Sequence, residues 1–167
     1  MNVSNAFLLL GSNLGDKLFF LTEAKKELQQ NVGMILNESG LYRTEAWGVT
    51  DQPSYLNQVV KIRCHFSPEI LLEQILLIEK KLGRERKALW DARTIDIDIL
   101  YIDQMVLQTP SLTIPHPRLH LRRFALVPMC EVAPRFVHPV FQLTQAALLE
   151  RCPDNLSVEL LTEQKNL

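Results

Sequence analysis

The sequence predicts an α+β fold, in which an antiparallel sheet carries helices on one face. Three observations lead to this prediction. Several short apolar runs have the composition or the alternation of β-strands. Two longer segments place leucine and isoleucine at helical spacing among charged residues. These segments follow one another in the order β-α-β-β-α-β, with additions at the C-terminal end, and that order is the split βαβ, or ferredoxin-like, arrangement.

The first strand and the first helix are predicted close to the N-terminal end. Residues 6–10, AFLLL, form a short apolar run that ends at Gly11, which is typical of a buried strand. The turn GSNLGDK then leads into a helix over about residues 14–30. We interpret Gly11 and Gly15 as turn glycines, because this turn lacks the Gly-Lys-Ser/Thr ending of a phosphate-binding P-loop.

Two further strands are predicted on either side of a loop. Residues 34–43, MILNESGLYR, favour a strand with room for a bulge at Gly40. The segment TEAWGVTDQPS is rich in turn-forming residues, and YLNQVVKIRC, residues 55–64, predicts the next strand. Alternation places Tyr55, Asn57 and Val59 on one face of that strand and Leu56, Gln58, Val60 and Ile62 on the other.

The second helix has clear start and stop signals. Ser67 is a capping residue, Pro68 suits the first helical position, and Glu69 is an acid in the first turn. The apolar stripe continues to about Leu82, and Gly83 is suited to the C-terminal cap. The sequence therefore predicts a helix that follows Ser67 and ends before Gly83.

Residues 93–102, RTIDIDILYI, combine a buried-strand pattern with two acidic residues. Alternation places Ile95, Ile97, Ile99 and Tyr101 on one face and Thr94, Asp96, Asp98, Leu100 and Ile102 on the other. The two carboxylates are then roughly 7 Å apart at their Cβ atoms, and their repulsion grows if water is excluded. Two interpretations stay open: a solvated face, or a site for a hard divalent cation, which prefers carboxylate oxygens.

The remaining residues add to the core fold without forming a second domain. After a turn around Asp103 and Gln104, SLTIPHPRLHLRRFALVPMCEVAP indicates a proline-bounded turn and a short helix. A last helix over about residues 143–151 and a polar tail follow. We see no repeat, low-complexity segment or linker, so residues 1–167 are predicted to form a single domain.

Composition excludes several classes of protein. The chain has 167 residues, of which 47% are apolar and 22% charged, as in ordinary globular proteins. A net charge of −1 and a pI of about 6.4 argue against a nucleic-acid-binding protein. Three scattered cysteines favour a reduced compartment, and no apolar run is long enough to span a membrane. The N-terminal end lacks signal-peptide features, so we expect a cytoplasmic protein without membrane or nucleic-acid partners.

Basic segments flank the aspartate strand in the sequence. Residues 84–93 hold Arg84, Arg86, Lys87 and Arg93, and residues 116–123 hold Arg118, Arg122, Arg123 and two histidines. Arginine forks bind phosphate oxygens, and Mg²⁺ is usually held by one or two carboxylates plus substrate phosphates. Together these features favour a polyphosphate site with magnesium. Taken singly, each has a simpler interpretation: solvated basic loops, a helix-edge glutamate at Glu79, and a structural histidine at His116.

Four segments together resemble the 6-hydroxymethyl-7,8-dihydropterin pyrophosphokinase family of folate biosynthesis. They are LLLGSNLGDK, YRTEAWGVTDQPSYLNQVV, IEKKLGRERKALWDARTIDIDIL and LTIPHPRLHLRRFALVPMCEVAP. These segments cover most of residues 7–134, and their spacing also fits the family. The resemblance implies an ATP-dependent diphosphokinase that transfers pyrophosphate from ATP to the hydroxymethyl group of the dihydropterin and releases AMP.

The resemblance also implies a set of site residues. Two Mg²⁺ ions would be held, together with ATP, by Asp96 and Asp98, and the catalytic group would be Arg84, Arg93, Asp96 and Asp98. The nucleotide site would comprise Glu79, Arg84, Arg86, Trp90, Arg93, Ile99, Thr113, His116 and Arg122. The pterin site would comprise Thr44, Ala46, Trp47, Gly48, Tyr55, Asn57 and Phe124. Residue chemistry agrees with the last set, because aromatic faces hold a flat ring and an asparagine amide offers both a donor and an acceptor.

Some features depart from the family pattern, and other functions stay open. Ser111 and Leu76 stand where some members have arginine and glutamine, and the loop between Arg86 and Trp90 is one residue shorter than in some relatives. We expect a monomer whose partners are ATP and the dihydropterin. The alternatives are a metal-dependent nucleotidyltransferase, which would release pyrophosphate and not AMP, and a non-catalytic nucleotide-binding module.

Overall fold

The computed structural model describes residues 2–46, 51–84 and 92–162, and a sheet lies at the centre of the fold. Within these ranges the sheet has six strands in the order β5-β1-β4-β3-β8, with β2 paired to another stretch of β4. The strands are β1 (Ser4–Ser12), β2 (Gly33–Glu38), β3 (Tyr42–Thr44), β4 (Tyr55–Cys64), β5 (Asp96–Ile102) and β8 (Val158–Leu160). A separate two-stranded sheet joins β6 (Leu107–Gln108) to β7 (Thr113–Ile114). All these pairings are antiparallel, as the sequence predicts.

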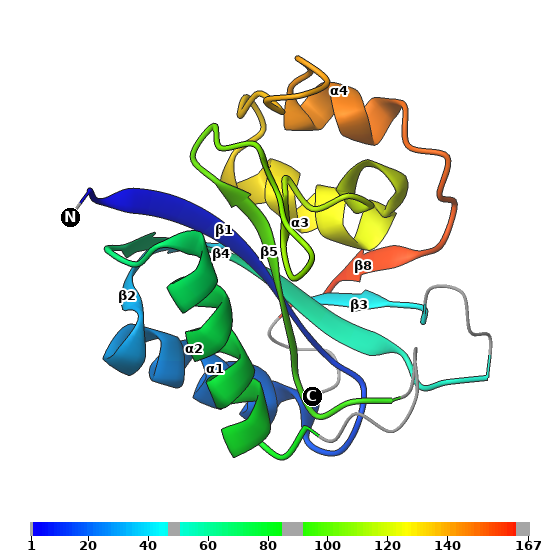
Figure 1. Cartoon of the computed structure of the whole chain (residues 1–167). Helices are drawn as coiled ribbons and strands as arrows, with labels where there is room; N and C mark the ends of the chain where they lie inside the picture. Colours follow the sequence, from blue (N-terminus) through cyan, green and yellow to red (C-terminus); the bar gives the residue numbers. More distant parts are fainter. Residues whose placement is uncertain (1, 47–50, 85–91, 163–167) are drawn as a thin grey trace.

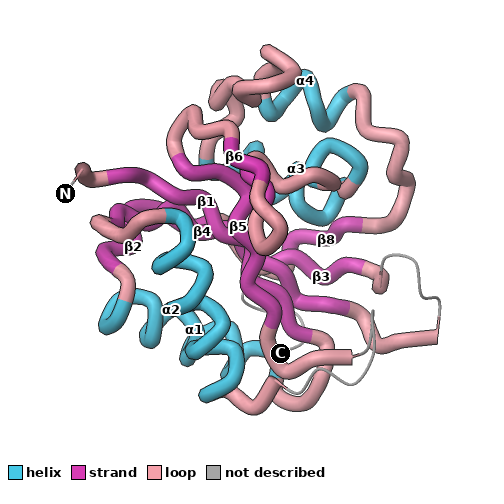
Figure 2. Tube along the Cα trace, in the orientation of Figure 1, coloured by secondary structure: helices cyan, strands magenta, loops and turns pink. Residues whose placement is uncertain are grey.

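Helices lie on both faces of this sheet (Figures 1 and 2). One face carries α1 (Lys17–Asn31) and α2 (Pro68–Lys81), and the other carries η1 (Leu119–Leu121), α3 (Arg123–Val132) and α4 (Gln145–Glu150). Strand β1 contributes Leu8 and Leu10 to the first core and Phe7 and Leu9 to the second. The predicted C-terminal additions thus cover part of the second face. In the described ranges, no helix has the length and apolar composition to cross a membrane.

The helix ends follow the local signals in the sequence. The Ser67 hydroxyl accepts the N–H of Ile70 at 3.4 Å and caps α2, and Gly83 follows the helix with a φ of +86°. Helix α1 begins later than predicted, at Lys17. The reason is that the Asp16 carboxylate caps the helix there, accepting the N–H of Phe19 at 3.0 Å.

The segment predicted as one strand over residues 34–43 forms two strands, β2 and β3. Between them, the Ser39 hydroxyl accepts the N–H of Val59 at 3.0 Å. The N–H of Gly40 donates to both carboxylate oxygens of Glu131, at 3.1 Å each. These side chains take the place of ladder partners, so the strand is interrupted at the position where the sequence allows a bulge.

Strand β5 contains a bulge that the sequence does not predict. Two consecutive residues of β1 pair with Tyr101 and Ile99, which leaves Leu100 as the extra residue. Beyond it the alternation reverses: Tyr101 packs beneath α3 and Ile102 packs beneath α1 and α2, opposite to the predicted faces. The two aspartates precede the bulge and share one face, as predicted.

Candidate active site

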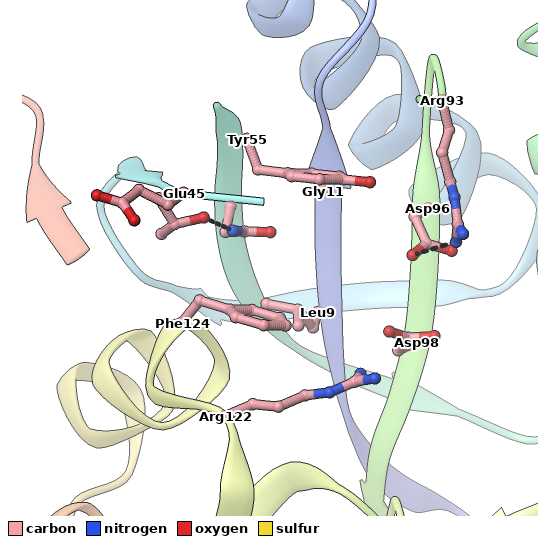
Figure 3. Close-up of a pocket in the computed structure, with 11 residues that line it drawn as sticks. Leu9, Gly11, Glu45, Tyr55, Arg93, Asp96, Asp98, Arg122 and Phe124 are labelled. Atoms are coloured by element: carbon pink, nitrogen blue, oxygen red, sulfur yellow. Dashed lines mark hydrogen bonds and ion pairs between the residues drawn. The ribbon is translucent and has the colours of Figure 1, made fainter. Parts of the chain in front are cut away.

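A pocket of about 70 Å³ opens on the sheet face that also carries α3 (Figure 3). Residues from β1, β3, β4, β5 and the start of α3 line it. The lining residues are Leu9, Gly11, Thr44, Glu45, Tyr55, Asn57, Arg93, Asp96, Asp98, Arg122 and Phe124. The structure therefore brings together residues that the sequence assigns to two different ligands, the pterin and the nucleotide phosphates.

The half of the pocket predicted to bind the pterin, called the pterin half below, is aromatic with one buried amide. Tyr55 and Phe124 approach from opposite sides of the pocket (Figure 3). Asn57 is 3% exposed, and its Nδ2 donates to the Thr44 hydroxyl at 2.6 Å. This bond fixes the amide plane and leaves Oδ1 directed toward Gly11. The arrangement suits a flat ring with polar edge groups.

Gly11 also lines the pocket, and the sequence pattern does not single it out as a site residue. It belongs to β1 and lines the pocket, whereas the sequence suggests a turn glycine. A Cβ at this position would lie 2.7 Å from Oδ1 of Asn57 and 3.4 Å from Cδ1 of Tyr55. Only glycine allows both side chains this close to β1. The one available signal was a glycine that ends an apolar run.

The half predicted to bind phosphates, called the phosphate half below, contains a cluster of ion pairs centred on Asp96, in which Arg84 and Glu79 take part without lining the pocket. Arg84 Nη1 donates to Asp96 Oδ1 at 2.8 Å, and Arg93 Nη1 donates to Asp96 Oδ2 at 3.0 Å. Arg84 also contacts the buried carboxylate of Glu79 in α2, which accepts the backbone N–H of Ile97 at 2.9 Å. The end of α2 and the start of β5 are thereby joined at the site.

Ionising Glu79, Asp96 and Asp98 together is unfavourable, because the three carboxylates are neighbours and two of them have a raised pKa. Burial, and then the charge of Asp96, raises the pKa of Asp98 to about 7, although Arg122 acts in the opposite direction. Burial and Asp96 likewise raise the pKa of Glu79 to about 7, against the effect of Arg84. A bound cation would stabilise the ionised forms of such neighbouring carboxylates.

The donor set fits magnesium that is shared with a substrate. Across residues 2–46, 51–84 and 92–162, no three His, Cys, Asp or Glu side chains cluster closely enough to cage a metal. Asp96 and Asp98 line one pocket next to arginines. Two carboxylates without further protein ligands suit Mg²⁺, which completes its shell with water and phosphate oxygens.

His116 lies near the phosphate half but does not line the pocket. Its Nδ1 accepts the backbone N–H of Arg118 at 3.1 Å, and the backbone N–H of His116 donates to the Leu100 carbonyl oxygen at 3.0 Å. Burial, and then the charge of Arg122, lowers the pKa of His116 to about 4. The imidazole is therefore neutral near pH 7, with its proton on Nε2.

The remaining predicted residues are not in the pocket lining. Ala46 and Thr113 lie outside it, and the Ile99 side chain belongs to the core beneath α1 and α2. Their contacts with ligands stay predictions. The predicted residues Trp47, Gly48, Arg86 and Trp90 lie outside the described residues.

An α+β fold that joins paired carboxylates and arginines to an aromatic slot fits an enzyme of the phosphotransferase class. The family model for 7,8-dihydro-6-hydroxymethylpterin-pyrophosphokinase (HPPK) matches residues 7–134, and the chain belongs to this family. The matched region contains all the residues that line the pocket.

Several curated proteins are similar to this chain over most of its length. The 2-amino-4-hydroxy-6-hydroxymethyldihydropteridine pyrophosphokinase of Aquifex aeolicus is 36% identical over 140 residues, 84% of this chain and 87% of that protein. The enzyme of the same name from Methylorubrum extorquens is 41% identical over 136 residues, 81% of this chain and 86% of that protein. The folic acid synthesis protein fol1 of Pneumocystis carinii is 36% identical over 149 residues, which are 89% of this chain but 20% of that protein.

Solved structures support the fold. The Plasmodium falciparum HPPK-DHPS wild type with pteroate superposes with a TM-score of 0.72 at 16% identity, covering 90% of this chain and 42% of that chain. At this identity the likeness concerns the fold alone. It agrees with the predicted ferredoxin-like arrangement, and the chain spans less than half of that longer protein.

Proposed function

We propose that the protein transfers a pyrophosphoryl group from ATP to the hydroxymethyl group of 6-hydroxymethyl-7,8-dihydropterin in folate biosynthesis. The products are AMP and the pterin diphosphate. One observation carries this proposal: a single pocket places an aromatic slot with a buried amide beside a carboxylate pair with arginines. The family membership and the names of the curated relatives support the same reaction.

The pterin ring stacks between Tyr55 and Phe124, which face each other across the slot. Because Asn57 already donates one N–H to Thr44, it offers its Oδ1 and its second N–H to the edge of the ring. We assign the remaining pterin contacts to the backbone of residues 44–48, including Ala46; Trp47 and Gly48 in this stretch lie outside the described residues. The hydroxymethyl group then points toward β5 and its aspartates.

The triphosphate of ATP binds on the other half of the pocket. Asp96 and Asp98 would hold two Mg²⁺ ions, which supply positive charge to the phosphate oxygens when bound. Arg84 and Arg93 form ion pairs with Asp96, and their guanidinium groups would bind the phosphate oxygens of a nucleotide at this site. Arg122, which is 8% exposed, adds a further positive charge beside Asp98. The remaining contacts are assigned to Glu79, Arg86, Trp90, Ile99, Thr113 and His116.

The transfer needs positioning and charge stabilisation more than proton transfer by a side chain. In-line attack requires the hydroxyl and the β-phosphorus to be held close together, and a pocket that both sets of residues line supports such an arrangement. Neutral His116 carries its proton on Nε2, the form that donates to a phosphate oxygen. We assign no side-chain general base.

The partners proposed for the chain are ATP and the dihydropterin, without nucleic acid or membrane. We expect a cytoplasmic monomer. The expected location and the expected monomeric state rest on composition and on the resemblance. Size-exclusion chromatography with light scattering tests the monomeric state.

AMP formation tests the proposed reaction directly. Purified protein with ATP and Mg²⁺ should release AMP only when 6-hydroxymethyl-7,8-dihydropterin is present. Release of pyrophosphate would instead indicate a nucleotidyltransferase, and nucleotide binding without any product would indicate a non-catalytic module. Chelation of the metal should abolish AMP formation.

A further inference from the structure

Asn13 lies in the turn between β1 and α1, outside the pocket lining. The proposed function gives it no contact with either substrate. It is 1% exposed and contacts two other segments of the chain. One contact is with Arg93, just before β5, and the other is with Gln52 and Pro53, just before Tyr55. Arg93 and Tyr55 belong to the two halves of the pocket, so the inference rests on the proposed function.

Asn13 holds the backbone of Arg93 from both sides. Its Oδ1 accepts the Arg93 N–H at 2.8 Å, and its backbone N–H donates to Arg93 O at 3.1 Å. The Arg93 guanidinium in turn donates to Asp96 at 3.0 Å. Asn13 thereby fixes the base of an arginine whose charged end lies at the phosphate half.

The same side chain holds the segment that leads into the pterin half. Asn13 Nδ2 donates to Oε1 of Gln52 at 3.2 Å and to Pro53 O at 3.4 Å. These residues lie just before Tyr55, which flanks the ring slot. Lys17 supports the same segment independently, because its Nζ donates to Ser54 O at 2.6 Å.

The planarity of the amide makes these two sets of contacts interdependent. Oδ1 accepts a hydrogen bond from Arg93, and Nδ2 donates to Gln52 and Pro53. Both the oxygen and the nitrogen of the amide therefore have hydrogen-bond partners. A rotation that improves one set of hydrogen bonds must disturb the other. Since Asn13 is buried, water cannot readily replace a lost partner.

We propose that Asn13 is a positioning residue that couples nucleotide binding to pterin binding. When phosphates draw Arg93 into place, the Asn13 amide is held in the orientation that fixes Gln52 and Pro53. Tyr55 is then presented to the ring before the pterin arrives. By thermodynamic linkage, the pterin strengthens nucleotide binding by the same factor.

Asn13→Asp tests the coupling with little change in shape. The aspartate keeps an acceptor for the Arg93 N–H but loses both donors to Gln52 and Pro53. The matched control is Lys17→Met, which loosens the same segment at Ser54 without touching Arg93. Pterin affinity is measured by calorimetry with and without Mg²⁺ and a non-hydrolysable ATP analogue, and the ratio of the two affinities is the coupling factor.

The expected pattern separates coupling from simple support. Asn13→Asp should lower the coupling factor about fivefold to tenfold, the effect of losing a buried hydrogen bond, with nucleotide affinity alone kept within about twofold. Lys17→Met should weaken pterin binding by the same factor with and without the analogue, so that its coupling factor stays at the wild-type value. If Asn13→Asp fails to fold, Gln52→Met removes one acceptor of the same amide and should lower the coupling factor likewise.

Two results would overturn the inference while leaving the proposed reaction intact. One is a wild-type protein that forms AMP but binds the pterin equally well with and without the analogue. The other is a folded Asn13→Asp, or a folded Gln52→Met in its place, with the wild-type coupling factor. A wild-type protein that forms no AMP would overturn the proposed function, and the affinity ratios would then show separately whether the coupling exists.

Discussion

The two faces of β5 share one backbone but have different surroundings. The face that bears Ile97 and Ile99, together with Ile95 just before the strand, is sealed by α1 and α2, and these side chains are at most 5% exposed. The opposite face bears Asp96 and Asp98 and opens into the pocket, because α3 and α4 cover only part of it. Stability therefore depends mainly on one face and chemistry on the other. Substitutions at neighbouring residues of this strand should have opposite consequences.

Asp98→Ala should produce the largest effect, and the effect should fall on turnover. Loss of this carboxylate removes a proposed metal ligand, and with it part of the charge stabilisation proposed for the transferred group. We expect turnover to drop by about a thousandfold or more. Unfolding experiments should show no loss of stability, because the variant removes a carboxylate that burial and Asp96 disfavour. A folded Asp98→Ala protein with turnover within tenfold of wild type would show that the aspartate is not a metal ligand.

Ile97→Ala, one residue away on the sealed face, should act on stability. Ile97 is 5% exposed in the core beneath α1 and α2, so truncation leaves a cavity there. We expect the free energy of unfolding to fall by about 2–4 kcal/mol, measured by urea denaturation. The variant keeps the backbone N–H that donates to Glu79, so turnover per folded molecule should change far less than in Asp98→Ala. Equal losses of turnover in the two variants would contradict the division between the faces.

Asn57→Ala should separate the two halves of the pocket. It removes the buried amide beside the ring slot and leaves the arginine cluster untouched. Pterin binding should weaken by about 1–3 kcal/mol, while binding of Mg²⁺ and a non-hydrolysable ATP analogue stays as in wild type. Calorimetric titration of each ligand provides the comparison. A parallel loss of both affinities would point to a folding defect and not to a pterin contact.

The smallest effect concerns pH and the core beneath α3 and α4. His138 is 3% exposed, and its Nδ1 accepts the N–H groups of Val140 and Phe141 at 3.1 Å each. Burial, and then the nearby His120, lowers the pKa of His138 to about 4. A lowered histidine pKa gives stability that is present above about pH 6.5 and is lost as the pH falls toward 4.

This pH effect should be small but specific. Between pH 8 and pH 6 the contribution of His138 to the free energy of unfolding should fall by about 1 kcal/mol. His138→Asn keeps an acceptor for the two backbone N–H groups but cannot titrate in this range. It should lower stability at all pH values and remove only the part of the pH dependence that His138 contributes, while the contributions of His116, Asp98 and Glu79 remain. An unchanged slope in the variant would mean that another group is responsible.

Much of the fold follows from local sequence signals. The Ser67 cap, the strand at residues 55–64 and the shared face of the two aspartates depend on neighbouring residues, and the structure confirms them. The bulge at Leu100 could not be predicted, because it arises from pairing with β1. The cover provided by α3 and α4 likewise depends on contacts distant in sequence.

In the candidate site, too, some residues could be predicted from the sequence and others could not. Tyr55, Asn57 and the aspartates stood out by residue type and by resemblance, and one pocket contains them. The roles of Gly11 and Asn13 could not be predicted from pattern. At Gly11, an added Cβ would lie 2.7 Å from Oδ1 of Asn57. Asn13 forms hydrogen bonds with Gln52 and Arg93, which are both distant in the sequence. Such roles come from tertiary contacts that no local spacing encodes.

A crystal structure of the ternary complex would test the central claim most directly. The protein would be crystallised with Mg²⁺, a non-hydrolysable ATP analogue and 6-hydroxymethyl-7,8-dihydropterin. We predict that the ring lies between Tyr55 and Phe124, that Asp96 and Asp98 coordinate the metal, and that the hydroxymethyl oxygen faces the β-phosphorus. A pterin bound elsewhere, or metal ions that contact neither aspartate, would contradict the account of one pocket serving both substrates.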